Sequence, residues 1–324
     1  MTRWTADSIP PLTGRRAVVT GANSGLGLHT AFELARHGAD VIMAVRDQAK
    51  GERAHNRIST ALRSNAGSGR VSLAALDLAD LASVRAFADE QAGVPLHLLV
   101  NNAGVMAIPR RETADGFEMQ LGTNHLGHAA LTFRLLPALV AAGAPGPASR
   151  VVTVSSGMHR RGRMDFDDLM GERSYKPWTA YGQSKLANLL FMAELERRLE
   201  AAGLPVASYG AHPGYADTNL QSVGPRMSGS AIGERMTSIG NRLLAQPASQ
   251  GALPTLYAAT VEGLPPGSYV GPDGLFEQRG HPQVVGRSKE AQSTADAARL
   301  WDVTEELVGI RFQDVVSRID AAQG

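Results

Sequence analysis

The feature that most restricts the fold is the segment TGANSGLG, residues 20–27, near the start of the chain. It follows an apolar run typical of a buried strand, residues 16–20, and precedes a helical pattern. Gly21 permits a tight turn, whereas Gly25 and Gly27 let the backbone approach a pyrophosphate at the positively polarised start of the helix. A plain structural turn is the alternative, but the strand–turn–helix context favours a dinucleotide site.

The rest of the chain alternates short apolar, β-branched runs with longer helical patterns. The predicted strands are residues 16–20, 40–45, 71–76, 96–101, 151–155, 206–211 and 268–271. The predicted helices are residues 26–37, 48–62, 81–91, 117–142, 181–202 and 249–260. Strands that are apolar throughout are typical of a parallel sheet covered on both faces. The alternation therefore predicts an α/β fold with a Rossmann-type doubly wound parallel sheet.

We expect a single domain over residues 1–324, because the sequence shows neither internal repeats nor a second apolar core. Its dinucleotide-binding core covers about residues 14–274. Residues 215–246, rich in Gly, Ser and Met, follow the carboxyl end of a strand and are interpreted as a substrate lid, with a surface loop as the alternative. The C-terminal extension, residues 275–324, contains an amphipathic segment at 297–307 that predicts a packed helix or, alternatively, an interface element.

Composition restricts the partners and the location. The formal net charge of +1 gives no electrostatic argument for a nucleic-acid partner, and the absence of Cys excludes disulfides and thiolate chemistry. Because we find no signal-peptide pattern and no uninterrupted apolar stretch of about 18 residues, we expect a cytoplasmic protein without a membrane span. His125 and His128 have no third ligand near them in sequence, so we expect structural roles for both and no metal site.

Tyr181 and Lys185 form a Y-x-x-x-K pattern within a predicted helix. Residues i and i+4 share a helix face, so the lysine ammonium is expected near the phenol. A free tyrosine has a pKa of about 10, and a nearby cation lowers that pKa by favouring the phenolate. The pair therefore predicts an acid/base that exchanges a proton with an alcohol or a carbonyl, although the pattern alone also occurs by chance.

The spacing T-G-x-x-x-G-x-G at residues 20–27, with NNAG at 101–104 and YGQSK at 181–185, resembles the short-chain dehydrogenase/reductase family. The resemblance covers about residues 14–274 and implies an oxidoreductase that transfers a hydride between a nicotinamide and a small-molecule carbonyl or alcohol. Besides Gly21, Gly25, Gly27, Tyr181 and Lys185, the implied cofactor contacts are Asn23, Ser24, Leu26, Asp77, Leu78, Asn102, Ala103, Gly104, Pro213, Gly214 and Thr218.

Arg46 follows the second predicted strand, where the choice of cofactor is made. A guanidinium at that position suits a ribose 2′-phosphate, which it grips bidentately, whereas an acid there accepts hydrogen bonds from the 2′-OH of NAD. The carboxylate of Asp47, one residue later, competes with Arg46 for the ribose. Arg46 is alternatively a plain surface charge. We therefore expect NADP(H), with NAD(H) as the alternative.

The resemblance implies two further members of the reaction centre. Ser156, at the end of VVTVSS, matches the family's catalytic serine, which holds the substrate oxygen against the tyrosine; Ser155 is the alternative. Asn124, in GTNHLGH, matches the asparagine that binds a water connecting the lysine to solvent. The predicted catalytic residues are thus Asn124, Ser156, Tyr181 and Lys185.

The interval between Ser156 and Tyr181 is longer than in simpler members, and residues 158–179 are expected to loop out beside the substrate mouth. The motif set resembles the branch of retinol dehydrogenases, WW-domain oxidoreductases and protochlorophyllide reductases, which implies a bulky lipophilic substrate. Within the insert, HRRGR at 159–163 is either an anion site or, as favoured here, a solvated loop face. Met158, Met164, Met227 and Met236 either line an apolar pocket or serve as packing.

Two other functions compete with turnover of an alcohol or carbonyl. A non-catalytic NADPH-sensing regulator is typically without the tyrosine or the lysine, and both are present in this chain. A nucleotide-sugar epimerase or dehydratase reuses the same pair, but with a different glycine spacing. Homo-oligomerisation stays open, because sequence alone does not show whether the long helices form a subunit interface.

Overall fold

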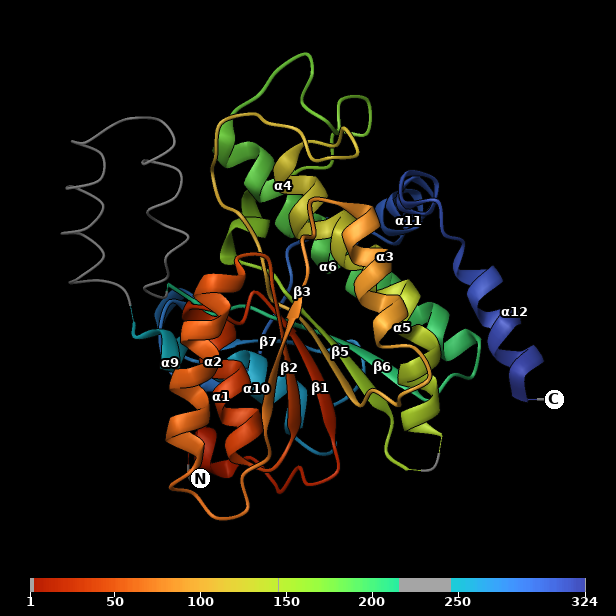
Figure 1. The fold of residues 1–324 in the computed structure, drawn as a ribbon. Helices are drawn as coiled ribbons and strands as arrows, with labels where there is room; N and C mark the ends of the chain where they lie inside the picture. Colours follow the sequence, from red (N-terminus) through yellow and green to blue (C-terminus); the bar gives the residue numbers. More distant parts are fainter. Residues whose placement is uncertain (1–2, 145, 216–245, 324) are drawn as a thin grey trace.

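The computed structural model describes residues 3–144, 146–215 and 246–323. Within these ranges, eight strands form one sheet in the order β3-β2-β1-β4-β5-β6-β7-β8 (Figure 1). The strands are β1 (Arg16–Thr20), β2 (Asp40–Val45), β3 (Val71–Ala75), β4 (Leu98–Asn101), β5 (Ser149–Val154), β6 (Val206–Ala211), β7 (Tyr269–Pro272) and β8 (Pro282–Val284). The strand order reverses beside β1, and ligands of doubly wound sheets bind at the carboxyl ends of the strands at such a reversal.

Two helical layers cover the sheet, one on each face (Figure 1). One layer contains α1 (Gly25–Arg36), α2 (Gln48–Leu62), α9 (Ala248–Gly251) and α10 (Leu253–Thr260). The other contains α3 (Leu81–Glu90), α5 (Gly127–Gly143), α6 (Pro177–Ala201) and α11 (Thr294–Val308). Successive residues of β1 point to opposite layers: Val18 packs in the second, Ala17 and Val19 in the first. The expected α/β fold, covered on both faces, is confirmed.

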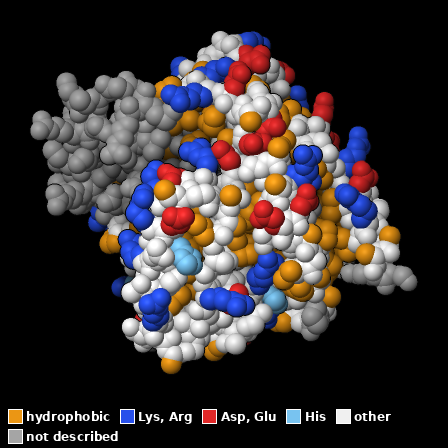
Figure 2. Space-filling model, in the orientation of Figure 1, with side chains coloured by type: hydrophobic (Ala, Val, Ile, Leu, Met, Phe, Trp, Pro, Cys, Tyr) orange, Lys and Arg blue, Asp and Glu red, His pale blue; other side chains and the backbone are white. Residues whose placement is uncertain are grey.

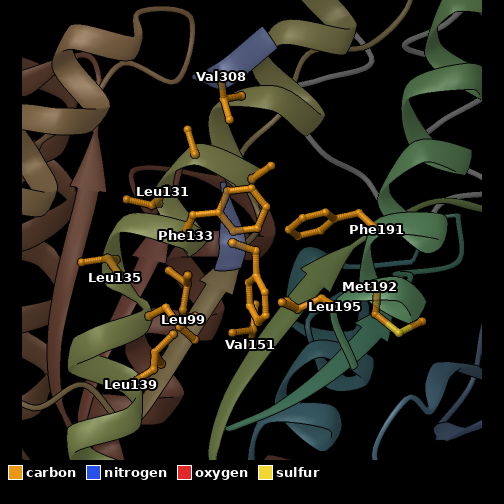
Figure 3. Close-up of a cluster of buried hydrophobic side chains, with 14 of the residues drawn as sticks. Leu99, Leu131, Phe133, Leu135, Leu139, Val151, Phe191, Met192, Leu195 and Val308 are labelled. Atoms are coloured by element: carbon orange, nitrogen blue, oxygen red, sulfur yellow. The ribbon is translucent and has the colours of Figure 1, made fainter. Parts of the chain in front are cut away.

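The larger apolar core lies between the sheet and α5 and α6 (Figure 3). Phe133 of α5 and Phe191 of α6 face each other above Val151 of β5 and Leu99 of β4 (Figure 3). All four side chains are buried. Each such side chain stabilises the fold by roughly 1.5–3 kcal/mol relative to exposure.

The C-terminal extension belongs to this core. Trp301 of α11 is 1% exposed and stacks on Phe191, with ring centroids 5.5 Å apart. Phe312 of α12 (Phe312–Gln323) contacts the same tryptophan edge-on. The expected packing of segment 297–307 is therefore confirmed. Neither α12 nor β8 was expected, and β8 corrects the prediction of an all-parallel sheet, because it pairs with β7 in the antiparallel direction.

The helix predicted over residues 117–142 is divided. It consists of α4 (Met119–Leu121), a π-helical turn over Gly122–Leu126, and α5. Met119–Gly143 is long and apolar enough to cross a membrane by length and composition alone, yet 78% of its most apolar stretch is buried inside the protein. Its apolar character thus fits its place as a central core helix.

Charged side chains of both signs alternate over the face shown in Figure 2, in agreement with a formal net charge of +1. Of the expected lid, only Tyr215 and Gln246 are described. Thr218, Met227 and Met236 lie outside the described residues.

Candidate active site

The glycine loop joins β1 to α1 as predicted. Gly21 and Gly25 have φ angles of 67° and 54°, a left-handed conformation that favours glycine. A Cβ on Gly27 would lie 2.5 Å from the Asn102 Nδ2 and 2.6 Å from the Gly21 carbonyl oxygen, so a side chain does not fit there. Ser24 is the N-cap of α1 but makes no side-chain cap hydrogen bond, which leaves the first-turn N–H groups for another acceptor. This donor set suits a pyrophosphate.

The Thr20 side chain ties the glycine loop to the NNAG segment. Its Oγ1 accepts hydrogen bonds of 2.9 Å from the backbone N–H groups of Asn102 and Ala103. The Asn102 Nδ2 donates to the Thr20 carbonyl at 2.8 Å, and His128 lies 2.9 Å from the same hydroxyl. From the sequence, Thr20 was assigned only to the glycine motif. Its position at the carboxyl end of β1 was the signal that its side chain could connect the glycine loop to the NNAG segment.

Arg46 is exposed immediately after β2. Its neighbour Asp47 is the N-cap of α2, accepts a hydrogen bond of 3.0 Å from the Lys50 N–H, and forms an ion pair of 2.8 Å with the Lys50 ammonium. The carboxylate expected to compete for the ribose is therefore bound to Lys50, whereas the Arg46 side chain is exposed.

Tyr181 and Lys185 lie on one face of α6, as their spacing predicts. The Lys185 Nζ is 5.8 Å from the centre of the Tyr181 ring and donates to the Val154 carbonyl at 3.1 Å. Burial raises the pKa of Tyr181 to about 12, and a hydrogen bond with Ser156 opposes that rise. Burial also lowers the pKa of Lys185 to about 8. In this chain alone, burial thus outweighs the lowering of the tyrosine pKa that the sequence predicted.

The two serines at the end of β5 point to different partners. The Ser155 Oγ donates to the Lys185 carbonyl at 2.7 Å, so it supports the backbone of α6. The Ser156 Oγ accepts the Met158 N–H at 3.2 Å and is the serine that hydrogen-bonds Tyr181. The geometry therefore favours Ser156 over its neighbour as the partner of the phenol.

Asn124 lies in the π-helical turn and is fully buried. Its Nδ2 donates to the Val105 carbonyl and to the Ser184 Oγ, both at 2.9 Å, and its Oδ1 accepts the Val105 N–H at 2.8 Å. A Cβ on Gly104 would lie 2.9 Å from that Oδ1 and 3.6 Å from the Lys185 Nζ, so the glycine lets the NNAG segment approach both groups. Asn124 thus joins this segment to α6, and its binding of a water stays a prediction.

The remaining predicted cofactor residues line the same edge of the sheet. The Asp77 Oδ1 accepts the Ala79 N–H at 3.0 Å, and Leu78 is buried. Pro213 and Gly214 follow β6, and Gly214 has a φ of 65°, with the Gln278 carbonyl 2.4 Å from where its Cβ would lie. The structure thus brings the described members of the predicted set together at the carboxyl ends of β1 to β6.

The sequence pattern of the short chain dehydrogenase family matches residues 15–227. The chain belongs to this family. It is 45% identical over 306 residues to a polyprenol dehydrogenase of Mus musculus, covering 93% of this chain and 86% of that protein. It is 42% identical over 301 residues to retinol dehydrogenase 11 of Homo sapiens, covering 92% and 87%. A crystal structure of an uncharacterised protein from Mycobacterium paratuberculosis is 47% identical with a TM-score of 0.77, covering 96% of this chain and 99% of that one.

As a short-chain dehydrogenase, the protein is an NAD(P)-dependent oxidoreductase that acts on CH–OH groups. The expected resemblance to the retinol dehydrogenase branch is also confirmed.

The insert of this short-chain dehydrogenase folds against the loop after the NNAG segment (Figure 1). The Tyr175 hydroxyl donates to the Ile108 carbonyl and lies 3.0 Å from the Glu118 Oε1, while Arg110 donates to the Met170 carbonyl at 3.2 Å. At the end of the insert, Trp178 is 56% exposed, and its ring meets Tyr181 edge-on at 6.2 Å. The insert thus brings an exposed aromatic ring next to the candidate acid/base.

The run HRRGR is neither a free anion site nor a uniformly solvated face. Arg160 pairs with Glu277 at 2.7 Å and Arg163 with Glu290 at 3.0 Å, whereas His159 is fully buried. The favoured interpretation as a solvated loop face was therefore wrong for His159 and incomplete for the two arginines. Their partners come from the C-terminal extension, which no spacing in the sequence connects to this run.

His125 and His128, the two histidines considered as metal ligands, are hydrogen-bonded to hydroxyls. The His125 Nε2 lies 2.8 Å from the Thr304 Oγ1, and His128 lies 2.9 Å from the Thr20 Oγ1. Burial lowers the pKa of His125 to about 3 and that of His128 to about 4, so both are neutral. Their contacts fit the structural roles expected from the sequence.

Proposed function

We propose that this short-chain dehydrogenase transfers a hydride between NADP(H) and a bulky lipophilic alcohol or carbonyl, with Tyr181 as the acid/base. The observation that carries the proposal is the hydrogen bond of the buried Tyr181 with Ser156, with the Lys185 ammonium 5.8 Å from the centre of the phenol ring. All these groups lie beside the carboxyl ends of β4 and β5.

In this proposal, Ser156 and Tyr181 share the substrate oxygen. The Met158 N–H donates to the Ser156 Oγ, so the serine proton is free to donate to the substrate oxygen or to the phenol. Two donors aimed at the oxygen stabilise the negative charge that develops on it during reduction. Tyr181 then gives its proton to that oxygen, or accepts one from an alcohol in the reverse direction.

Lys185 and Asn124 support this proton exchange. The pKa of Lys185, lowered to about 8 by burial, is close to the physiological range, so the ammonium gives up a proton more readily than an exposed lysine does. Asn124 holds Ser184, which lies on α6 directly before the lysine. The oxidised nicotinamide, when bound, supplies a positive charge that favours the phenolate, and the reduced nicotinamide supplies the hydride.

The first helical turn suits the pyrophosphate of either cofactor, and Arg46 supports the choice of NADP(H). The uncapped start of α1 offers N–H donors for the pyrophosphate, and the exposed guanidinium offers a bidentate partner for a 2′-phosphate. Asp47 does not compete, because it caps α2 and pairs with Lys50.

Apolar surface near the site supports a lipophilic substrate. Trp178 is exposed beside Tyr181. A hollow of about 430 Å³ adjoins the predicted cofactor residue Gly214 and is lined by Tyr215, Leu275 and Phe276, together with Gly274, Gln278 and Arg279. The relatives at 42–45% identity are named for a polyprenol and a retinol, which are long apolar alcohols.

A panel of alcohols and carbonyls of graded chain length, assayed with NADPH and with NADH, tests this proposal. We expect kcat/KM to rise with the apolar length of the substrate and to be higher with NADPH. A clear preference for NADH would overturn the assignment of Arg46, and a preference for small polar substrates would overturn the lipophilic site. Absence of turnover across the panel would overturn the proposed substrate class.

A further inference from the structure

His159 lies three residues after Ser156, in the short 3-10 helix η3 (Gly157–Arg161). Its side chain is 0% exposed, and both ring nitrogens have backbone partners. The Nδ1 is 2.7 Å from the Ser156 carbonyl oxygen, and the Nε2 is 3.3 Å from the backbone nitrogen of Ser288. An imidazole thus bridges the end of β5 and the segment that follows β8.

These partners fix the tautomer of the ring. The Ser288 N–H only donates, so the Nε2 must accept, and the proton of the neutral ring therefore resides on the Nδ1. The Nδ1–H in turn donates to the Ser156 carbonyl. Burial lowers the pKa of His159 to about 4, so the ring stays in this neutral form at physiological pH.

Three hydrogen bonds hold Ser156, and one of them comes from the His159 ring. Its carbonyl accepts both the His159 ring N–H and the His159 backbone N–H, the latter at 3.0 Å. Its Oγ accepts the Met158 N–H at 3.2 Å, which restricts the rotation of the hydroxyl. The residue itself is extended, with φ −155° and ψ 155°, so it has no strained conformation that would fix it from within.

The far side of the imidazole is held equally firmly. The Tyr269 ring of β7 meets the His159 ring edge-on at 5.5 Å. Arg160, next in sequence, donates to the Gly286 carbonyl at 3.1 Å and pairs with Glu277. The segment that supplies the Ser288 N–H is therefore attached to η3 at the neighbouring residue as well.

We propose that His159 is a positioning residue that holds Ser156 against Tyr181 through its Nδ1–H, with the Ser288 N–H selecting the tautomer that makes this donation. The inference rests on the proposed function, because it assumes that Ser156 and Tyr181 form the reaction centre. It gives the C-terminal extension a part in catalysis without contact with the substrate.

Two amide variants separate this role from simple packing. In His159→Asn the side-chain NH₂ takes the place of the Nδ1 and keeps a donor for Ser156, while the partner of Ser288 is lost. In His159→Gln the amide lies at the place of the Nε2, so the donor to Ser156 is lost. Both remove the aromatic ring, so a packing role predicts similar losses of activity for the two.

Steady-state kinetics on the full chain with NADPH and a carbonyl substrate give the first readout. We expect His159→Gln to lower kcat by about 10- to 100-fold, as a misplaced reacting group does, and His159→Asn to stay within about threefold of the unchanged protein. The KM for NADPH should not change in either. Equal losses of kcat in the two variants, or none in His159→Gln, would overturn the proposal.

A second readout needs no turnover. Nitrogen-15 NMR of the imidazole should show the His159 proton on the Nδ1 and an unprotonated Nε2 in the unchanged protein. Hydrogen exchange of the Met158 amide, which reports the Ser156 hydroxyl, should accelerate in His159→Gln and stay slow in His159→Asn. A proton on the Nε2 would refute the positioning role, whereas inactivity of the unchanged protein with a correct tautomer would refute the proposed function alone.

Discussion

Replacement of Arg46 by Ala should weaken the binding of NADPH while leaving that of NADH almost unchanged. The side chain is exposed after β2, and the adjacent carboxylate of Asp47 is engaged by Lys50 at 2.8 Å. The guanidinium therefore does not have to break an ion pair with Asp47 in order to contact a phosphate.

The expected size of this effect follows from the exposure of the side chain. A hydrogen bond to a charged group contributes about 1.5–3 kcal/mol, and exposure to water favours the lower end of that range. A loss of about 1.5 kcal/mol corresponds to roughly a tenfold rise in Kd for NADPH. NADH has no 2′-phosphate, so its Kd should change by less than about twofold.

Titration with each cofactor, followed by its fluorescence or by calorimetry, measures the two Kd values without a substrate. Arg63→Ala is the matched control, because it removes an exposed arginine just beyond the other end of the 15-residue helix α2, about 22 Å away. A parallel loss of both cofactors in Arg46→Ala, or the same selective loss in Arg63→Ala, would refute the assignment of Arg46.

Two further predictions concern the core and the glycine loop. Trp301→Ala should lower the free energy of unfolding by about 3–5 kcal/mol in urea denaturation, whereas Trp178→Ala, at a 56% exposed position, should change it by less than about 0.5 kcal/mol. A small effect at Trp301 would show that the C-terminal extension is not part of the main core. Gly27→Ala should abolish NADPH binding in titrations, because its Cβ would lie 2.5 Å from the Asn102 Nδ2, whereas Gly146→Ala, with no atom within 4 Å of the added Cβ, should bind normally. Normal binding by Gly27→Ala would contradict the close packing of the loop.

Most strands could be predicted because their apolar runs end abruptly. The strands β1, β2 and β6 and the helix α2 have the bounds expected from the sequence. The helix α6 begins four residues before its predicted start, at Pro177, a residue type that is favoured in the first helical turn. The helix α12 also has a signal in the sequence, the apolar spacing of Phe312, Val315, Val316 and Ile319, which is typical of one face of a helix.

Other parts of the fold carried no readable signal. The strand β8 has three residues, and two of them are exposed, so it shows neither an apolar run nor a clear alternation. Its antiparallel pairing with β7 depends on tertiary contacts that no local pattern encodes. The π-helical turn around Asn124 is equally hidden, because its residues are as buried as those of the α-helix that follows, and no local pattern separates a π-helical turn from an α-helical one.

The sequence predicts those parts of the candidate site in which the spacing of residues along a helix brings two side chains together. The pairing of Tyr181 with Lys185 follows from their separation by one helical turn. The choice of Ser156 over Ser155 needed the structure, because both serines directly follow β5. The environment of His159 was not predictable, because its partner Ser288 is 129 residues away in sequence. Burial of the phenol, which raises its pKa, likewise depends on the assembled fold.

The measurement that tests the central claim most directly is the rate of carbonyl reduction by Tyr181→Phe, followed as the loss of NADPH absorbance. The substitution removes one hydroxyl from a side chain that is 6% exposed and keeps its packing, so the Tm and the Kd for NADPH should not change. Our account predicts a fall in kcat of about 10²- to 10⁴-fold, the contribution of a positioned acid. Full reductase activity in the phenylalanine variant would contradict the assignment of Tyr181 as the proton donor.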